Sequence, residues 1–301
     1  NLFSKQYLGY SDKNSKNSYL VAANTIMDYH LYKRIQEALS NSPPNAEQQA
    51  FNWLVVGAQK TAKTTTVLQL AYIIQAMAMQ KKLIKKVLIF DPMWHESFEP
   101  AGIRKAIGFI NPNFVLPNYK VITVDDIQSY GASKEDYYCW AVVRDRGSRV
   151  QDFCQEALTV KNAITILDDV GSRITGNVRN FPQYIDLLAY NRINCNDVFL
   201  IYHQYKYVPP SFWQYFQRAI VKQSNEQKFS DDIYPRDLYI QAQKEVTLEN
   251  KERTFPNKMN LAYRILLPNE NLSFKEDNGY FIATDESGNE YLLLQDQIID
   301  L

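Results

Sequence analysis

A lysine and a threonine follow a glycine-initiated loop at a spacing that suits phosphate binding. The segment Phe51–Leu70 opens with an apolar run that stops at Gly57, and Lys63 and Thr64 end the loop that follows. A lysine ammonium can contact the β and γ phosphates, and a threonine hydroxyl can bind the accompanying magnesium ion. The backbone N–H groups of such a loop point at one anion beside the positive end of a helix. The order strand, loop and helix therefore predicts a nucleotide site.

The loop matches the pattern Gly-x-x-x-x-Gly-Lys-Ser/Thr with one departure, because Ala62 occupies the position of the second glycine. A methyl group there restricts how closely the backbone can approach phosphate, so we expect weaker nucleotide binding than a glycine would give. A plain strand–turn–helix is the alternative interpretation. The residues expected to contact nucleotide are Gly57, Ala58, Gln59, Lys60, Thr61, Ala62, Lys63, Thr64 and Thr65.

Two adjacent carboxylates stand where a phosphate loop needs a partner. Asp168 and Asp169 follow the apolar run Ala163–Leu167. We expect Asp168 to hold magnesium through water and Asp169 to polarise the water that attacks the terminal phosphate. Capping of a turn by two aspartates is the alternative, and the order after a phosphate loop favours the metal role.

The composition indicates a globular chain without net charge. Of its 301 residues 46% are hydrophobic, and 33 basic residues balance 33 acidic ones. This balance argues against coating nucleic acid through bulk positive charge, although a ring could line its channel with a few basic residues per subunit. Three dispersed cysteines predict no zinc site, no disulfide framework and a reducing compartment. No apolar run reaches membrane-span length and no secretory signal opens the chain, which predicts a cytoplasmic protein.

The elements that must position these residues alternate between apolar strands and helices. After a helix over 63–80, strands are predicted over 87–90, 120–124, 138–144, 163–167, 197–202 and 218–221, with helices over 150–160, 182–192 and 209–216. Alternation of this kind is typical of a parallel sheet covered on both faces. The predicted fold class is therefore α/β.

Composition divides the chain into three predicted parts. Residues 1–48 form an extension with one helix over 24–39 and a linker that contains Ser40–Asn45. Residues 49–230 form the P-loop core. Residues 231–301 are richer in charge, glutamine and asparagine, and they are predicted to be a small appended segment with a hairpin over 279–294.

Five features together resemble the FtsK–HerA superfamily of P-loop motor ATPases, which translocate DNA as hexameric rings and include viral genome-packaging ATPases. The features are the loop 57–64, the strand with Asp-Pro at 89–92, the strand with carboxylates at 166–169, the helix end at 187–192 and the strand end at 198–204. The resemblance covers residues 50–225. It implies a RecA-like, mostly parallel sheet with helices on both faces, with ATP and Mg²⁺ as cofactors and a ring of identical subunits.

Carried over residue by residue, the resemblance makes Lys63 and Thr64 ligands of nucleotide and magnesium, with Asp168 as support for the metal. Asp169 stands where the family more often has glutamate, which puts the positioning of the attacking water in question. Gln204 occupies the sensor position, where it would contact the γ-phosphate or its water.

Arginines are the candidates for contacts across the ring and with DNA. Arg192 matches the family's place for a residue that neutralises charge in a neighbour's site, and Arg179 is the alternative. The alternative for each arginine is a surface position near a helix end, without a role in catalysis. Loops 144–149 and 171–180 carry arginines that suit contacts with DNA phosphates, and simple solvated loops are the alternative.

The resemblance implies an ATP-driven nucleic-acid translocase. The compact length favours a viral genome-packaging motor, cytoplasmic in the host cell or associated with the virion, with a capsid or portal vertex as a further partner. A conjugative or chromosome-pumping translocase is one alternative, and a non-motor assembly switch driven by nucleotide is another. Partition-type ATPases fit less well, because Ala58 stands where they have a lysine.

Overall fold

The computed structural model describes residues 50–80, 83–116, 118–133, 139–169, 178–226, 229–252, 262–268, 272–277, 280–284, 290–294 and 297–300. The helix predicted over 24–39, its linker and residues 171–177 of the predicted DNA loop lie outside these residues.

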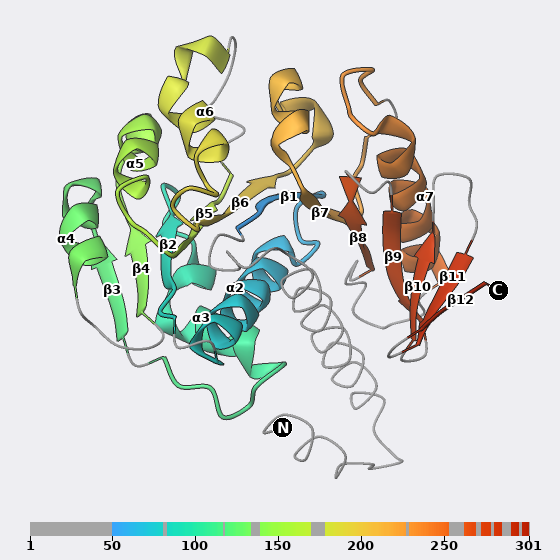
Figure 1. Ribbon diagram of the computed structural model, residues 1–301, viewed down its shortest axis with the longest axis horizontal. Helices are drawn as coiled ribbons and strands as arrows, with labels where there is room; N and C mark the ends of the chain where they lie inside the picture. Colours follow the sequence, from blue (N-terminus) through green and yellow to red (C-terminus); the bar gives the residue numbers. More distant parts are fainter. Residues whose placement is uncertain are drawn as a thin grey trace.

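One twelve-stranded sheet runs through the described part of the chain, in the order β12-β11-β10-β9-β8-β7-β1-β6-β5-β2-β4-β3 (Figure 1). From β7 to β3 all neighbouring strands are parallel, which confirms the predicted α/β class. These strands are β1 (Asn52–Val56), β2 (Lys86–Phe90), β3 (Asn118–Ile122), β4 (Cys139–Val143), β5 (Ala163–Leu167), β6 (Asp197–Tyr202) and β7 (Arg218–Lys222).

Helices cover both faces of the parallel strands and bury two separate cores. Along β1, Trp53 and Val55 belong to the core under one set of helices, and Leu54 and Val56 belong to the core on the opposite face. This alternation follows from the two-residue period of a strand. It also explains why the central strands are apolar throughout, because neither of their faces meets water.

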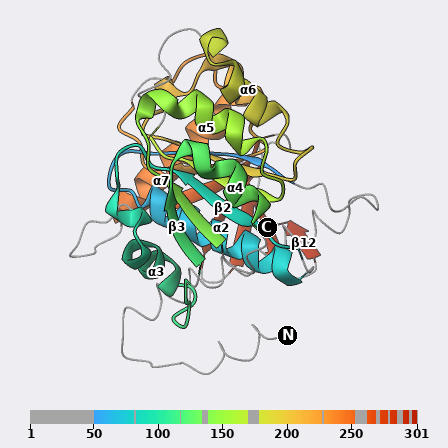
Figure 2. The ribbon, with the colours of Figure 1, turned by 90° about the vertical axis from the view of Figure 1, so that its left-hand side faces the viewer.

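The two helical layers are unequal in size (Figure 2). The first face packs against α2 (Lys63–Gln80) and α3 (Pro100–Gly108). The second face packs against α4 (Ile127–Ala132), α5 (Val150–Ala157), α6 (Pro182–Ala189) and α7 (Arg236–Glu252). Short 3₁₀ segments connect these elements: η2 (Glu96–Phe98), η3 (Val124–Asp126), η4 (Gly147–Arg149), η6 (Val178–Asn180), η7 (Tyr205–Tyr207) and η8 (Pro210–Tyr215).

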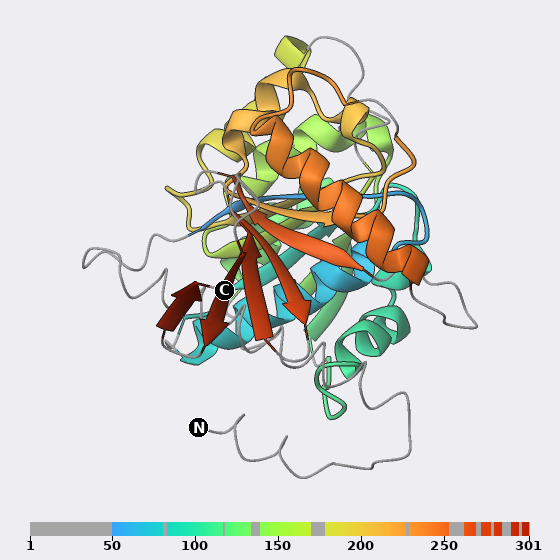
Figure 3. The same cartoon turned by 90° about the vertical axis from the view of Figure 1, so that its right-hand side faces the viewer.

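Beyond β7 the strands become antiparallel. They are β8 (Tyr263–Leu267), β9 (Leu272–Asp277), β10 (Tyr280–Thr284), β11 (Glu290–Leu294) and β12 (Gln297–Asp300). Pairing of β10 with β11 confirms the predicted hairpin. Figure 3 shows α7, which the sequence analysis did not predict, crossing the strands beside β7. Because β8 pairs with β7, the last strands continue the core sheet, and a division at residue 230 stays a prediction.

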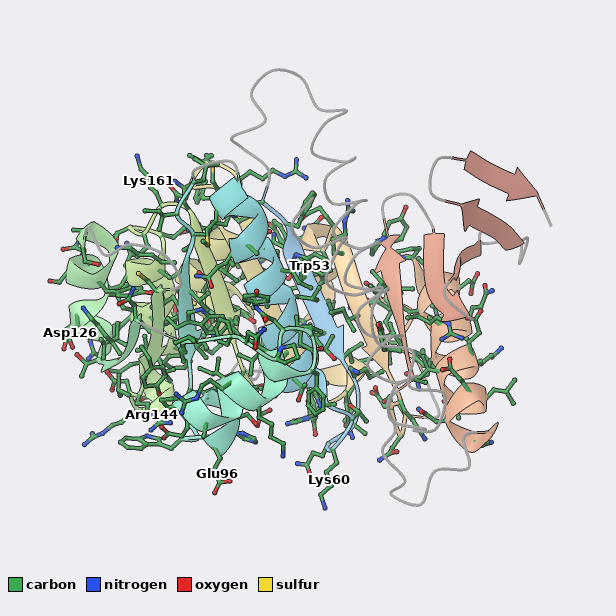
Figure 4. All side chains as sticks on the ribbon, turned by 90° about the horizontal axis from the view of Figure 1, so that it is seen from below. Trp53, Lys60, Glu96, Asp126, Arg144 and Lys161 are labelled. Carbon is green, nitrogen blue, oxygen red and sulfur yellow. The ribbon has the colours of Figure 1, made fainter. Side chains whose placement is uncertain are left out.

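The loops that carry chemistry gather at one edge of the sheet. Parallel strands all end on the same side, so the carboxyl ends of β1, β2, β4, β5 and β6 meet there. In Figure 4, Lys60, Glu96 and Arg144 lie along this edge, and Lys161, which precedes β5, lies at the opposite edge. Among the described helices, none combines the length and apolarity that a membrane span requires.

Candidate nucleotide-binding site

The loop after β1 is fastened to both neighbouring strands. The N–H of Gly57 donates to the carbonyl of Tyr202 over 3.3 Å, and the N–H of Ala58 donates to the carbonyl of Gln223 over 2.7 Å. A Cβ at position 57 would lie 2.7 Å from the Cβ of Lys222. Glycine is therefore required here by the close approach of β7, independently of any ligand.

Two residues of the loop adopt the left-handed backbone conformation that favours glycine. Lys60 has a φ of 63° and Ala62 a φ of 58°. The missing second glycine of the pattern is therefore a left-handed position, and alanine adopts it at a cost of about 1–2 kcal/mol. The carbonyl of Ala62 accepts hydrogen bonds from the N–H and hydroxyl of Thr66, at 3.1 and 3.0 Å, which join the loop to α2.

We expect the substitution Ala62→Gly to tighten ATP binding by up to about fivefold, or about 1 kcal/mol, because the backbone can approach phosphate more closely without the methyl group. Calorimetric titration of ATP measures the effect. Ala58→Gly is the matched control, since it removes a methyl group from a loop residue whose φ is not positive. Unchanged or weaker affinity of the Ala62→Gly protein would show that the methyl group is harmless.

The ammonium group of Lys63 is buried under the loop, with 6% of the residue exposed. It donates to the carbonyls of Gly57 and Ala58, each at 2.8 Å, and approaches Nδ1 of His203 at 3.0 Å. Burial lowers the pKa of Lys63 to about 8, while the charges of Asp168 and Asp169 act to raise it. The cation is thus held among oxygen and nitrogen acceptors next to two carboxylates.

The two carboxylates occupy the end of β5, as the sequence predicts. Asp168 keeps some exposed surface, yet burial raises its pKa to about 6, against the lowering effect of His95, Lys63 and His203. Asp169 adopts a φ of 48°, a left-handed conformation that turns the chain just after the strand. A carboxyl that burial disfavours as an anion is suited to a site where a cation compensates its charge.

The end of β6 brings a residue that the sequence analysis missed. Strand β6 lies between β1 and β5, and the ring of His203 bridges their ends: its Nδ1 faces Lys63 and its Nε2 lies 3.4 Å from Oδ1 of Asp169. The next residue, Gln204, has its Oε1 buried without a hydrogen-bond partner. In the sequence, the one sign of a role for His203 was its position directly before Gln204. Only the strand order, with β6 between β1 and β5, shows that His203 lies at the nucleotide site.

A second polar cluster follows β2 and β4. Asp91 accepts hydrogen bonds from the N–H of His95 at both carboxylate oxygens, at 3.0 and 2.9 Å, and burial raises its pKa. Nη2 of Arg144 lies 2.6 Å from Oε1 of Glu99, and its Nε lies 3.5 Å from Asp91. The guanidinium also lies 5.1 Å from the ring centre of Trp94. Asp91, which ends the strand with Asp-Pro at 89–92, is thus part of a buried ion-pair cluster next to the nucleotide site.

The loop 144–149 is less available for DNA than the sequence suggests. The Arg144 side chain is 9% exposed and is occupied by the ion pairs just described. Arg149 pairs with three carboxylates, at 2.7 Å from Asp125, 3.0 Å from Asp145 and 3.0 Å from Asp152. Because both arginines are paired with carboxylates of the same chain, these pairs count against a contact with DNA, and the DNA role of the loop stays a prediction. Arg146 is exposed on the same loop.

The two candidates for an arginine that acts across subunits lie in different places. Arg192 is exposed in the turn after α6, ahead of the amino end of β6, and so at the edge opposite to Lys63. It cannot reach the loop of its own chain. Arg179 is exposed on η6, between β5 and α6. The geometry is compatible with either residue acting on a neighbouring copy, and Arg192 could act in no other way.

Thr64 and Asp168 are the residues that would hold magnesium. Thr64 lies in the first turn of α2 and Asp168 at the end of β5. Within the described ranges, no group of three or more histidine, cysteine or acidic residues is arranged to hold a metal ion by itself. The donor set of one hydroxyl and one partly buried carboxylate fits an ion that arrives with phosphate oxygens as its other ligands.

No protein-family model matches this chain, and no curated protein matches it. Solved structures with a similar fold include the genome packaging NTPase B204 from Sulfolobus turreted icosahedral virus 2 in complex with AMP (15% identity, 76% of this chain, 98% of that chain, TM-score 0.47). The AMPPCP complex gives 16% identity, 73% and 93% coverage and a TM-score of 0.45. B204, the DNA-packaging ATPase from Sulfolobus Turreted Icosahedral Virus, is 14% identical. The match covers 75% of this chain and 96% of that chain, with a TM-score of 0.42. At such values, residue roles do not pass from those proteins to this chain.

Proposed function

We propose that this protein binds ATP with magnesium at the carboxyl edge of its sheet and hydrolyses it. The observation that carries the proposal is the meeting of three strand ends around one buried lysine. Lys63 follows β1, Asp168 and Asp169 follow β5, and His203 follows β6. Lys63 and Thr64 would bind phosphate and magnesium, Asp168 would support the metal, and Asp169 would polarise the attacking water.

We further propose that hydrolysis drives the movement of DNA by a ring of identical subunits, as in a viral genome-packaging motor. This step rests on the five sequence features that resemble the FtsK–HerA motors. In this proposal Gln204 reads the γ-phosphate, which agrees with the buried, unpaired Oε1 of its side chain. DNA contacts fall to Arg146 and to the loop 171–180, and a capsid or portal vertex is the further partner.

ATP turnover with and without double-stranded DNA tests the motor directly. We expect DNA to stimulate phosphate release. Tight ATP binding without turnover under either condition would replace the motor by a nucleotide-driven assembly switch. One observation favours that second candidate: Lys63 already has three acceptors within the chain, so phosphate binding must displace one of them even without hydrolysis.

Mixing experiments test the contribution of Arg192 across subunits. If Arg192 completes a neighbour's site, the Arg192→Ala and Lys63→Ala proteins should regain ATP turnover when they are mixed, because an intact Lys63 in one subunit can then be served by an intact Arg192 in the next. Lys161→Ala is the control, since Lys161 is exposed at the same edge. Absence of any recovery on mixing would remove Arg192 from this role.

A further inference from the structure

His203 contacts both the phosphate-binding lysine and the carboxylate expected to act on water. We propose that His203 is a positioning residue that competes with a nucleotide phosphate for Lys63 and couples this exchange to Asp169. The inference rests on the proposed nucleotide site and adds to it a residue to which neither the motif nor the resemblance assigns a role.

All three donor hydrogens of Lys63 have acceptors within the chain. An ammonium group has three hydrogens to donate, and the structure gives its nitrogen three acceptors: the carbonyls of Gly57 and Ala58 and Nδ1 of His203. A phosphate oxygen that binds Lys63 must therefore displace one of them. Charge-assisted bonds to phosphate are stronger than bonds to neutral acceptors, so the exchange is favourable once the phosphate has entered the loop.

Of the three acceptors, the ring of His203 is the one that gives way. The two carbonyls belong to a backbone that is fastened to the neighbouring strands by the N–H groups of Gly57 and Ala58. His203 is the acceptor on a side chain, which is 29% exposed and can rotate. Its own backbone is held in place just downstream, because the N–H groups of Tyr205 and Lys206 donate to the carboxylate of Glu226 at 2.5 and 3.0 Å. The exchange thus moves the ring and leaves the strand end in place.

The other ring nitrogen of His203 links this exchange to Asp169. A neutral imidazole whose Nδ1 accepts from Lys63 carries its proton on Nε2, and Nε2 lies 3.4 Å from Oδ1 of Asp169. Rotation of the ring away from Lys63 therefore also changes its contact with Asp169. Arrival of phosphate at the loop is in this way transmitted to the residue that would polarise water, through one side chain.

The proposal predicts opposite effects on binding and on turnover. In His203→Ala, phosphate no longer competes for the third hydrogen of Lys63, so a non-hydrolysable ATP analogue with magnesium should bind about fivefold more tightly, as expected for one hydrogen bond of about 1 kcal/mol. ATP turnover should fall, because Asp169 loses its contact with the ring. A merely structural role would weaken both.

Two conservative variants separate the functions of the two ring nitrogens. The amide oxygen of His203→Asn can replace Nδ1 but cannot reach Asp169, so affinity should return to the wild-type value while turnover stays low. The longer amide of His203→Gln can replace the Nε2 donor, so turnover should recover in part while affinity stays high. Lys206→Ala, exposed on the adjoining 3₁₀ segment, is the control for changes at this turn.

Calorimetric titration and steady-state phosphate release on the full chain decide between the outcomes, with thermal melting to confirm folding. Unchanged or weaker affinity in His203→Ala, with binding intact in the wild-type protein, would overturn the role of His203 and leave the nucleotide site standing. If the His203→Asn and His203→Gln proteins do not differ from each other in affinity or turnover, the proposed role of His203 is also overturned. Absence of analogue binding by the wild-type protein would overturn the proposed function together with this inference.

Discussion

ATP turnover by the Lys63→Ala protein is expected to fall about 10²–10³-fold, the loss that removal of one buried donor to a developing charge typically causes. The reason is the position of the ammonium group, which is desolvated under the loop and faces two carboxylates across the ends of β1 and β5. A methyl group cannot supply that charge to the β and γ phosphates. Steady-state phosphate release with ATP and magnesium measures the change.

The substitution should leave the fold intact. Burial lowers the pKa of Lys63 to about 8, so the folded chain already disfavours its charge, and alanine removes that cost along with the three contacts. Lys60→Ala is the matched control, since Lys60 is a lysine of the same loop whose side chain is exposed. Wild-type turnover by folded Lys63→Ala protein would contradict the proposed site, whereas equal losses in both variants would indicate damage to the loop as a whole.

The Asp168→Asn protein is expected to be more stable and less active. Burial raises the pKa of Asp168 from its usual 3.8 to about 6, so ionisation at neutral pH costs the folded state up to about 3 kcal/mol, reduced by the solvent that still reaches the residue. Asparagine removes this cost. It also removes the charge that supports magnesium, and losses of about 10–100-fold in activity are typical for residues of this kind.

The pH dependence of stability gives this prediction a sharp form. Because the pKa of Asp168 is higher in the folded than in the unfolded chain, its proton stabilises the fold at low pH, and this contribution is lost as pH rises through about 6. The two proteins should therefore have the same melting temperature at about pH 3. Between about pH 4 and 7 their melting temperatures should diverge, with the higher value in the Asp168→Asn protein. Thermal melting without magnesium measures the difference. A less stable Asp168→Asn protein at pH 7 would show that the carboxylate has a compensating partner.

Local patterns in the sequence were sufficient for most of the elements. The bounds of α2, β5 and β6 agree with the predicted ranges, because an apolar run interrupted by glycine, proline or aspartate marks a buried strand wherever it lies in the chain. The expected need for glycine at position 62 is explained by the positive φ of Ala62. Shorter helices were missed, namely α3 and α4, as was the longer but polar α7.

The tertiary structure decided which of these residues meet. Neighbouring parallel strands lie about 4.8 Å apart, so placing β6 between β1 and β5 sets His203 against both Lys63 and Asp169. The ion-pair partners of an arginine also come from distant parts of the chain. The sequence therefore could not show that Arg144 is paired and buried while Arg192 is exposed. Arg144 is buried among carboxylates, and Arg192 is exposed at the opposite edge.

Some properties of the phosphate loop were set by the local sequence, and others only by the tertiary structure. Its residue types, spacing and flanking strand and helix were readable from the sequence alone, because each depends on neighbours within a few residues. The contact of Lys63 with His203, the requirement for Gly57 beside Lys222 and the elevated pKa of Asp168 could not be read from the sequence. These properties arise from strands far apart in the chain, whose pairing no local pattern encodes.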